Sequence, residues 1–413
     1  MNANPEGIDE ALASLLQPGQ DIVVAQGFGF PRAIMSALSR HAGRLQGSRV
    51  LVGLVPPDMP VIPSVHYESF FPSGPFGSSA GIEKAGATYL RCSLYELSRS
   101  FRDGERKVDL AIAMGTPARD GYHSLGLAVD FIGPATEAAS AVLLEVAQNV
   151  PWTGAGSVIN HKRIVTVESP TGATTTPPSS PITGDTRLAE NLLPLIPDGA
   201  VVELGMGRWF EHLIGLLIKA GRRIHLATGS LGDWVADLAH AQLISLSDGL
   251  RATAAGGSQS FYEAFPALGI ELVPAYVTHD PVVLRSYPAF RAINSVLEVD
   301  LLGRANCEYG QGGRRGGLGG LPDFARAAAA AEDGLSIIAL PAAAGGISRI
   351  VPKLAAAHVS LERNAIDVIV SEYGVADLRG RSDRECAKAI LQIAQPDKRH
   401  EIEAHAHSLE IAL

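Results

Sequence analysis

The chain has 413 residues and a formal net charge of −9 at neutral pH. A chain of this length is expected to form about two to three domains. Hydrophobic residues make up 46% of it and charged residues 19%, a balance typical of a globular protein with a large core. Because the chain is acidic and has no long basic run, we expect no nucleic-acid partner.

The cysteines and histidines give no pattern of metal or disulfide chemistry. Cys92, Cys307 and Cys386 are far apart, so they form neither a disulfide framework nor a zinc quartet. The twelve histidines show no metal-binding spacing, and we expect no metal. The N-terminal residues lack a signal-peptide pattern, and no apolar run is as long as a membrane span. These features predict a cytoplasmic protein that contacts no membrane.

The first half of the chain alternates predicted strands and helices. A strand at residues 22–25 leads into Gly27-Phe28-Gly29, and a helix follows as far as Leu38. Further strands are predicted at 50–55, 110–114 and 141–146, with a helix around 135–140. Strands that alternate with helices indicate a mostly parallel α/β sheet.

A change of composition divides the chain. Residues 168–185 are rich in proline and threonine and poor in apolar residues, which predicts a linker. We therefore predict one domain at residues 1–182 and a second at residues 183–413.

The second half begins with the same pattern as the first. A predicted helix at 187–195 precedes a strand at 201–204, the turn Gly205-Met206-Gly207 and a helix at 209–219. A strand–Gly-x-Gly–helix unit that occurs twice predicts two α/β domains of similar topology. Neither unit has the third glycine of a dinucleotide-binding fingerprint. Each turn is either a tight connection or a source of N–H groups for an oxyanion hole.

Later elements continue the α/β pattern. Strands are predicted at 271–273, 336–340 and 366–371. Ser382 and Glu385 form a capping box that predicts the start of a helix, which ends before Pro396.

The stretch 294–324 combines three features of a binding site. Glu298 and Asp300 lie on one face of a predicted strand whose other face is apolar. Six glycines between residues 312 and 320 would let backbone N–H groups approach a ligand. Pro322 and Asp323 then begin a helix, whose N-terminus attracts negative charge. The combination predicts an anion or thioester site; the alternative is a solvated strand edge and a flexible loop.

Other polar residues are weighed against structural roles. His405 and His407 lie near the C-terminus, where a solvated surface is favoured over a metal site, and His123 is interpreted as structural. Ser258 is not part of a Gly-x-Ser-x-Gly elbow and is interpreted as a turn residue. Glu203, at the end of a predicted strand, is either a site carboxylate or a surface carboxylate.

Several motifs can be compared with a known family. They are Gly121-Tyr122-x-Ser124-Leu125-Gly126, Glu145-Val146, Gly205-Met206-Gly207, Asp280-Pro281, Asn294-Ser295-x-x-Glu298-Val299-Asp300-Leu301, Gly317-Leu318-Gly319-Gly320-x-x-Asp323-Phe324, residues 347–352 and Ser371-Glu372-Tyr373-Gly374-Val375-Ala376-Asp377-Leu378-Arg379-Gly380. Over nearly its whole length the chain resembles the acetyl-CoA hydrolase/transferase family, the group that contains 4-hydroxybutyrate CoA-transferase. The last of these motifs is highly specific.

The resemblance implies two CoA-transferase-type α/β domains with the active site at their interface. Coenzyme A would enter as part of an acyl-CoA substrate, with a carboxylic acid as the second substrate of a transferase and no permanently bound cofactor. A homodimer is implied by the same resemblance. In such enzymes a glutamate attacks the thioester and a glutamyl-CoA forms. The oxyanions would be held by backbone N–H groups, here those of Gly205, Met206 and Gly207 and of Gly317, Leu318, Gly319 and Gly320.

Three positions depart from the pattern of the family. The nucleophilic glutamate of the family follows a His-Thr or His-Ser pair, but here His225 is followed by Leu-Ala-Thr-Gly-Ser-Leu-Gly-Asp. Alanine cannot act as a nucleophile. Residues 341–346 lack the CoA-contacting lysine, and the Gly-Gly-Gln of the family is Gly319-Gly320-Leu321.

These departures leave three interpretations open. In the first, the protein is an enzyme acting on a short-chain or small carboxylic acyl-CoA without a glutamyl intermediate. Glu298 or Glu203 would then be a general base toward water or the substrate α-carbon. In the second, it is a CoA-ester-binding or partner subunit that has lost catalysis. In the third, it is a standard transferase whose nucleophile lies elsewhere in the chain.

Overall fold

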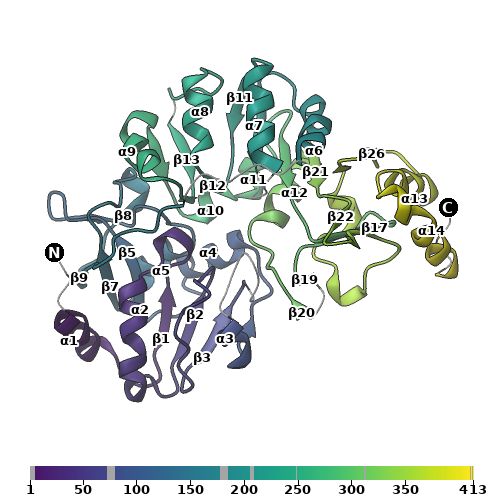
Figure 1. Cartoon of the computed structure of the whole chain (residues 1–413). Helices are drawn as coiled ribbons and strands as arrows, with labels where there is room; N and C mark the ends of the chain where they lie inside the picture. Colours follow the sequence, from purple (N-terminus) through teal and green to yellow (C-terminus); the bar gives the residue numbers. More distant parts are fainter. Residues whose placement is uncertain are drawn as a thin grey trace.

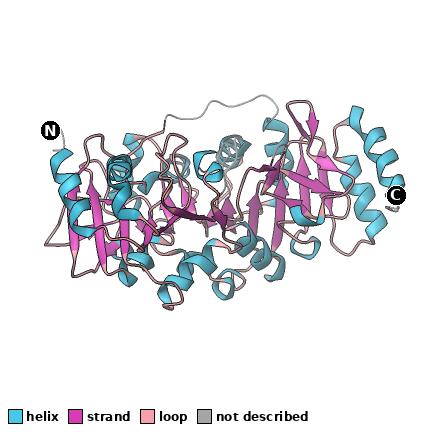
Figure 2. Ribbon diagram, turned by 90° about the horizontal axis from the view of Figure 1, so that it is seen from below, coloured by secondary structure: helices cyan, strands magenta, loops and turns pink. Residues whose placement is uncertain are grey.

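Two sheets, one in each half of the chain, dominate the structure (Figure 1). The structure is a computed structural model that describes residues 5–71, 80–176, 185–204, 209–247, 249–310 and 313–409, with Ile411 and Leu413. The predicted domain boundary between residues 182 and 183 and the turn Gly205-Met206-Gly207 lie outside the described residues. Helices lie on both sides of the strands, which confirms the predicted α/β class (Figure 2).

The first sheet has seven parallel strands in the order β4-β3-β2-β1-β5-β7-β9. Its strands are β1 (Asp21–Val24), β2 (Arg49–Val52), β3 (His66–Ser69), β4 (Thr88–Tyr89), β5 (Leu110–Gly115), β7 (Ala141–Val146) and β9 (Ile164–Glu168). The helices are α1 (Pro5–Leu15), α2 (Arg32–Leu38), α3 (Ala80–Lys84), α4 (Leu94–Arg102) and α5 (Ile132–Ala138). Every residue of the central strands β5 and β7 is buried, as expected of a parallel sheet covered on both faces.

The second sheet has six strands in the order β11-β10-β16-β21-β25-β26. They are β10 (Ala200–Leu204), β11 (Ile224–Leu226), β16 (Arg291–Asn294), β21 (Leu335–Ala339), β25 (Val368–Ser371) and β26 (Gly374–Asp377), which is antiparallel at the edge. The helices are α6 (Asp185–Leu192), α7 (Trp209–Lys219), α8 (Trp234–His240), α9 (Gln259–Leu268), α10 (Ala275–Thr278), α11 (Pro281–Leu284), α12 (Leu321–Ala330), α13 (Asp383–Gln392) and α14 (Arg399–Ser408).

Short strands form small sheets between these layers. The pairs are β6 (His123–Ser124) with β8 (Val158–Ile159), β12 (Ser230–Leu231) with β14 (Ala254–Ala255), β13 (Leu250–Ala252) with β15 (Ile270–Leu272), β19 (Tyr309–Gly310) with β20 (Gly313–Arg314), and β22 (Ala343–Ala344) with β23 (Ile347–Ser348). A three-stranded sheet joins β18 (Ala305–Asn306), β17 (Glu298–Asp300) and β24 (Ile350–Val351). In the described part of the chain, none of the helices is long and apolar enough to cross a membrane.

The two large sheets share one strand order. In the first, β1 lies between β2 and β5, with β7 and β9 beyond β5. In the second, β10 lies between β11 and β16, with β21 and β25 beyond β16. The strand of each half that precedes Gly-x-Gly therefore occupies the same place in its sheet, as the repeated sequence pattern predicts.

Most predicted elements are confirmed with small shifts in their bounds. The predicted strand at 141–146 is β7, and Ser382 caps α13 in a capping box with Glu385. The helix predicted around residues 135–140 is α5, which begins earlier, at Ile132. Asp130 lies just before this start, and its carboxylate accepts hydrogen bonds from the N–H groups of the two residues that follow it.

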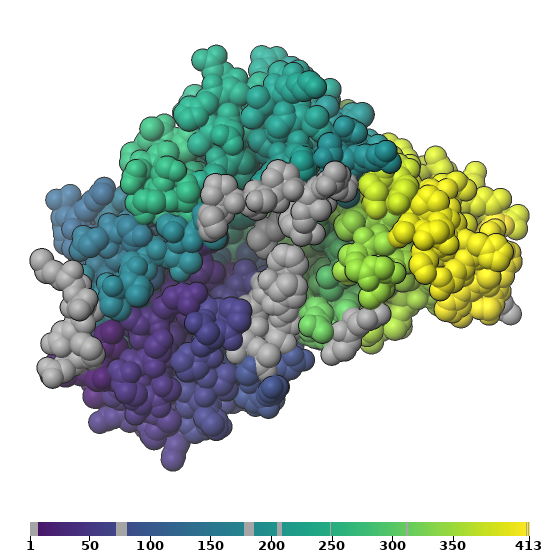
Figure 3. All heavy atoms as spheres, viewed as in Figure 1, coloured from purple at the N-terminus to yellow at the C-terminus, as the bar shows by residue number. Residues whose placement is uncertain are grey.

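The first Gly-x-Gly turn packs the two halves together. Gly27–Gly29 forms a 3-10 turn, with Gly27 at φ +56°. The ring of Phe28 lies against Gly256 of the second half, so close that a Cβ atom at Gly256 would overlap it. Nearby, the N–H of Val129 donates to the carbonyl of Thr253 at 2.9 Å. The space-filling view shows the first half in broad contact with the residues that follow it (Figure 3).

The first part of the predicted linker is held against both halves. The N–H of Ser169 donates to the carbonyl of Val146 at 2.7 Å. The N–H of Thr176 donates to the carbonyl of Gly257 at 3.0 Å, and the hydroxyl of Tyr262 donates to the carbonyl of Thr174 at 2.8 Å. Residues 169–176 are therefore part of the folded structure and do not act as a free tether.

We expect Gly256→Ala to destabilise the protein, because the added methyl group would overlap the Phe28 ring. Overpacking of this kind costs about 1–3 kcal/mol. Gly215→Ala is the matched control, since Gly215 lies exposed in α7 with open space around it, and the change should stabilise by about 0.5–1 kcal/mol. Urea denaturation of both variants measures the two free energies; equal stability of Gly256→Ala and wild type would contradict this account of the junction.

Candidate active site

A short glycine-rich loop connects the β19–β20 hairpin to α12. We call residues 316–320 the glycine loop. Gly320 is the residue that precedes the helix, and Pro322 lies in its first turn, as predicted. Within the part of the chain that the structure describes, the N–H groups of Gly317, Leu318, Gly319 and Gly320 donate no hydrogen bond. Four N–H groups in one loop, next to a helix N-terminus, therefore have no acceptor among the described residues.

The glycine loop lies at the contact between the two halves. A Cβ atom at Gly317 would overlap the carbonyl oxygen of Phe70, and one at Gly319 would lie 3.3 Å from the ring of Phe71. Gly319 also has a φ of +54°, which favours glycine. The glycines are therefore needed for close packing of the backbone, whether or not a ligand binds.

His279 is a site residue that the sequence did not reveal. Its ring is only 2% exposed and lies between two glycines: a Cβ atom at Gly229 would be 3.0 Å away, and one at Gly320 would overlap the ring. The ring also packs on that of Phe324, with 4.5 Å between centroids. Burial lowers the pKa of His279 to about 3, so the imidazole is neutral at physiological pH. In the sequence, the adjacent Asp280-Pro281 motif was the only feature that pointed to this region as part of the site.

Residues 225–233 reach the glycine loop through His279, whose ring lies against both Gly229 and Gly320. The hydroxyl of Thr228 donates to the carbonyl of Leu204, at the end of β10, at 3.2 Å. The carboxylate of Asp233 accepts from the N–H of Ser258 at 3.0 Å and from its hydroxyl. Ser258 caps α9, so its interpretation as a structural residue rather than a nucleophile agrees with the geometry.

Glu298 lies one strand away from the glycine loop. Its half-buried carboxylate accepts a hydrogen bond from the amide of Asn306 at 3.1 Å, across the β17–β18 pair. The next residue, Cys307, donates its thiol to the carbonyl of Gly317 at 3.5 Å. The carbonyl of Glu308 accepts the N–H of Gly316 at 3.0 Å. Residues 306–308 therefore contact Glu298 through Asn306 and hold the glycine loop through Cys307 and Glu308.

Asp300 has a structural role instead. Its side chain is fully buried and accepts from the guanidinium of Arg304, at 2.9 Å from Nε, and from the N–H of Leu354 at 3.0 Å. Because Arg304 neutralises this carboxylate, Asp300 does not act on Glu298 as an unpaired like charge.

Glu203 is buried, and its interpretation as a surface carboxylate is wrong. Only 3% of the residue is exposed, and its carboxyl accepts from the amide of Asn294 at 2.7 Å. The two residues end the neighbouring strands β10 and β16. Burial raises the pKa of Glu203 to about 8, so it is mainly protonated at neutral pH.

Other candidates have structural or surface positions. His123 Nδ1 lies 2.7 Å from the carbonyl oxygen of Thr116, and His405 and His407 are exposed on α14. The three cysteines form no disulfide. Among the described residues, no group of three or more His, Cys, Asp or Glu side chains is placed to hold a metal ion.

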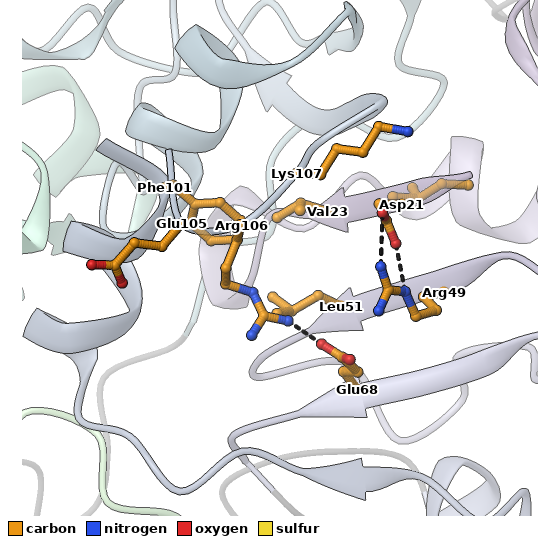
Figure 4. A pocket seen from close by; sticks show the side chains of 10 residues that line it. Asp21, Val23, Arg49, Leu51, Glu68, Phe101, Glu105, Arg106 and Lys107 are labelled. Atoms are coloured by element: carbon orange, nitrogen blue, oxygen red, sulfur yellow. Dashed lines mark hydrogen bonds and ion pairs between the residues drawn. The ribbon is translucent and has the colours of Figure 1, made fainter. Parts of the chain in front are cut away.

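A pocket of about 330 Å³ lies at the beginning of strands of the first sheet (Figure 4). Asp21 and Arg49, the first residues of β1 and β2, form an ion pair there at 2.6 Å, and Arg106 pairs with Glu68. The pocket contains none of the predicted site residues. Because both arginines are already paired, they offer no free charge to a ligand.

Comparisons with known proteins agree with these features. Residues 257–406 match the profile of the acetyl-CoA hydrolase/transferase C-terminal domain. The chain is 32% identical to the 4-hydroxybutyrate coenzyme A transferase of Clostridium kluyveri, over 78% of this chain and 77% of that protein. It is 34% identical to the acetyl-CoA hydrolase of Kluyveromyces lactis, over 51% of this chain and 40% of that protein. The crystal structure of RipA from Yersinia pestis superposes with a TM-score of 0.85 and 26% identity, over 98% of this chain and 97% of that one.

Stability should fall as pH rises from about 5 to about 8.5. The protein environment raises the pKa of Asp130 to about 6, of Asp323 to about 7 and of Glu203 to about 8. The folded state therefore binds protons in this range that the unfolded chain has released, which favours folding at the lower pH. Thermal melts should give a higher Tm at pH 6 than at pH 8.5.

Glu203→Gln should reduce this dependence most strongly above pH 7, since it removes the group with the highest of the three pKa values. Glu190→Gln, on the exposed face of α6, is the control and should leave the dependence unchanged. If Glu203→Gln retains the full slope above pH 7, the assignment of a protonated Glu203 is wrong.

Proposed function

Because the chain belongs to the acetyl-CoA hydrolase/transferase family, we propose that it consumes a short-chain acyl-CoA by attack of water, without a glutamyl-CoA intermediate. The observation that supports this most directly is the set of four N–H groups at residues 317–320 for which the described part of the chain offers no acceptor. Donors of this kind stabilise the oxyanion that forms when a thioester carbonyl is attacked. We propose that the acyl group is small, as the sequence resemblance implies.

In the proposed reaction, the thioester carbonyl oxygen lies against the glycine loop. Glu298 takes a proton from water while the water oxygen forms a bond to the carbonyl carbon. The tetrahedral oxyanion accepts hydrogen bonds from the loop N–H groups. When the carbonyl re-forms, the carbon–sulfur bond breaks and the CoA thiolate takes the proton from Glu298. The products are a carboxylic acid and CoA.

Glu298 suits the role of base better than Glu203. Glu298 is half-buried, and one partner, Asn306, bonds its carboxylate. Glu203 is buried and mainly protonated below about pH 8, so only a small fraction of it can accept a proton at neutral pH. We propose that Glu203 holds the end of β16 through Asn294, and thereby the strand that leads to Glu298.

The proposal excludes a covalent step at residues 225–233. The carboxylate in this segment is Asp233, and it is engaged by Ser258 at the start of α9. Thr228 is bonded to the end of β10. A second candidate function is a CoA-ester-binding or partner subunit without catalysis, which is favoured by the absence of a glutamate at residues 225–233. A homodimer and a carboxylic acid co-substrate stay predictions from the resemblance.

We expect the purified protein to hydrolyse acetyl-CoA without forming an enzyme adduct. Protein incubated with acetyl-CoA should be trapped with borohydride or hydroxylamine and mapped by mass spectrometry, while release of the thiol is followed with a colorimetric reagent. Thiol release with no modified glutamate is the expected result. A modified glutamate at any position would restore the ordinary transferase mechanism. A rise in Tm with millimolar acetyl-CoA but no thiol release would favour the non-catalytic subunit.

Glu298→Gln should lower kcat by about 10²- to 10⁴-fold, the usual contribution of a general base. The amide keeps the shape of the side chain and still accepts from Asn306, so Tm and the binding of acetyl-CoA should change little. Glu403→Gln, on the exposed surface of α14, provides a matched control with wild-type turnover. Unchanged turnover in Glu298→Gln would remove Glu298 from the mechanism.

A further inference from the structure

A segment of the first half runs alongside the glycine loop and contacts it at three levels. Before the loop, the guanidinium of Arg314 lies over the ring of Tyr89, 4.9 Å from its centroid. Within the loop, the carbonyl of Gly319 accepts the N–H of Leu94 at 2.8 Å. After the loop, the carboxylate of Asp323 accepts the N–H of Tyr95 at 3.2 Å. Residues 89–95, which we call the support segment, therefore hold the loop at its beginning, middle and end.

The last of these contacts is built from two helix N-termini. Ser93 caps α4 in a capping box with Glu96, which fixes the first turn of that helix. Asp323 lies in the first turn of α12. Its carboxylate thus accepts a hydrogen bond from the Tyr95 N–H at the start of α4 while it occupies the start of α12. Helix N-termini favour negative charge, which explains an acidic residue at this position.

We propose that Asp323 is a positioning residue that fixes the glycine loop on the support segment, so that the four unpaired N–H groups keep one place relative to the first half. The catalytic role of the loop in this inference rests on the proposed function, whereas the restraint of the loop by Asp323 does not. Asp323 acts through the loop and through Tyr95 and is not itself assigned contact with substrate. The charge of Asp323 is secondary, because what the contact needs is an acceptor of the right size.

The packing of the loop shows why a fixed position is required. On one side the loop backbone touches Phe70 and Phe71, and on the other Gly320 touches the buried ring of His279. Glycine residues supply no side chain that could hold the loop in place by itself. An oxyanion hole loses much of its effect when its donors are displaced by about 1 Å. Contacts from the support segment supply the missing restraint.

Asp323→Asn and Asp323→Leu form a matched pair of variants. Asparagine keeps an acceptor for the Tyr95 N–H, whereas leucine has a similar size but no acceptor. Without acyl-CoA, amide exchange of Leu94 and Tyr95 should become about tenfold faster in Asp323→Leu and stay near wild type in Asp323→Asn, in line with the loss of one hydrogen bond. Exchange in the buried strands β5 and β21 should not change, because the large sheets are not involved.

Turnover provides a second measurement. In Asp323→Leu, kcat for acetyl-CoA should fall about 100-fold with KM changed only a few-fold, since displaced donors affect the transition state most. Asp323→Asn should restore most of kcat. Tyr89→Leu is an independent variant at the other end of the loop, and the Tyr89 hydroxyl has no hydrogen-bond partner in the described structure, so its loss leaves no partner unpaired. It should also lower kcat without lowering Tm.

The two measurements separate the two proposals. If wild type shows no turnover but exchange at Leu94 and Tyr95 responds as expected, the positioning role stands and the proposed function fails. Unchanged exchange in Asp323→Leu would overturn the positioning role whatever the activity. Equal losses of kcat in Asp323→Asn and Asp323→Leu would also overturn it, because a missing charge rather than a missing acceptor would then be responsible.

Discussion

The close approach of glycine backbone to the opposite half is the constraint on which the rest of the structure depends. Gly317 lies against the carbonyl of Phe70, and Gly320 lies against His279, at distances that leave no room for a Cβ atom. Any side chain at these positions would separate the halves or displace the histidine. The N–H groups of these glycines, like those of the two residues between them, have no acceptor among the described residues. The packing and the proposed chemistry thus both require glycine here. A side chain at Gly317 or Gly320 would disturb the contact between the halves and the position of the loop N–H groups together.

The two halves share a strand order, but the residues at the end of β1 and β10 have different partners. In the first half the turn carries Phe28, which packs against Gly256 across the junction. In the second half the strand before the turn ends in Glu203 and Leu204, and it is tied to β16 by Asn294 and to residues 225–233 by Thr228. The repeated unit of the first half therefore packs the two halves together, whereas that of the second half lies beside the candidate site. The glycine loop has no counterpart in the repeated sequence pattern.

The strands, the α/β class and the repeated unit could be predicted because they follow from short-range patterns of apolar residues and turn residues. The start of α12 was also predicted, from Pro322 and Asp323. The partners of these residues could not be, since Tyr95 and Asp323 are 228 positions apart. His279 carries no local signal of burial between two glycines. Glu203 was ambiguous because a strand end is exposed at the edge of a sheet but buried in the middle, and only the strand order places β10 between two neighbours.

The charges around the glycine loop favour a reacting group that is neutral on arrival, such as a thioester carbonyl, and becomes negative during reaction. Asp323 already occupies the N-terminus of α12, and with a pKa of about 7 it is partly ionised at neutral pH. An anion that arrived with its charge would meet this carboxylate, whereas a thioester carbonyl would not. His279 is neutral and Glu203 is mainly protonated, so neither adds a charge. In the proposed reaction, the negative charge of the tetrahedral intermediate is therefore stabilised mainly by short-range hydrogen bonds from the loop N–H groups rather than by the dipole of α12. Such bonds act on an oxyanion more strongly than on the carbonyl from which it forms, which is the difference that catalysis requires.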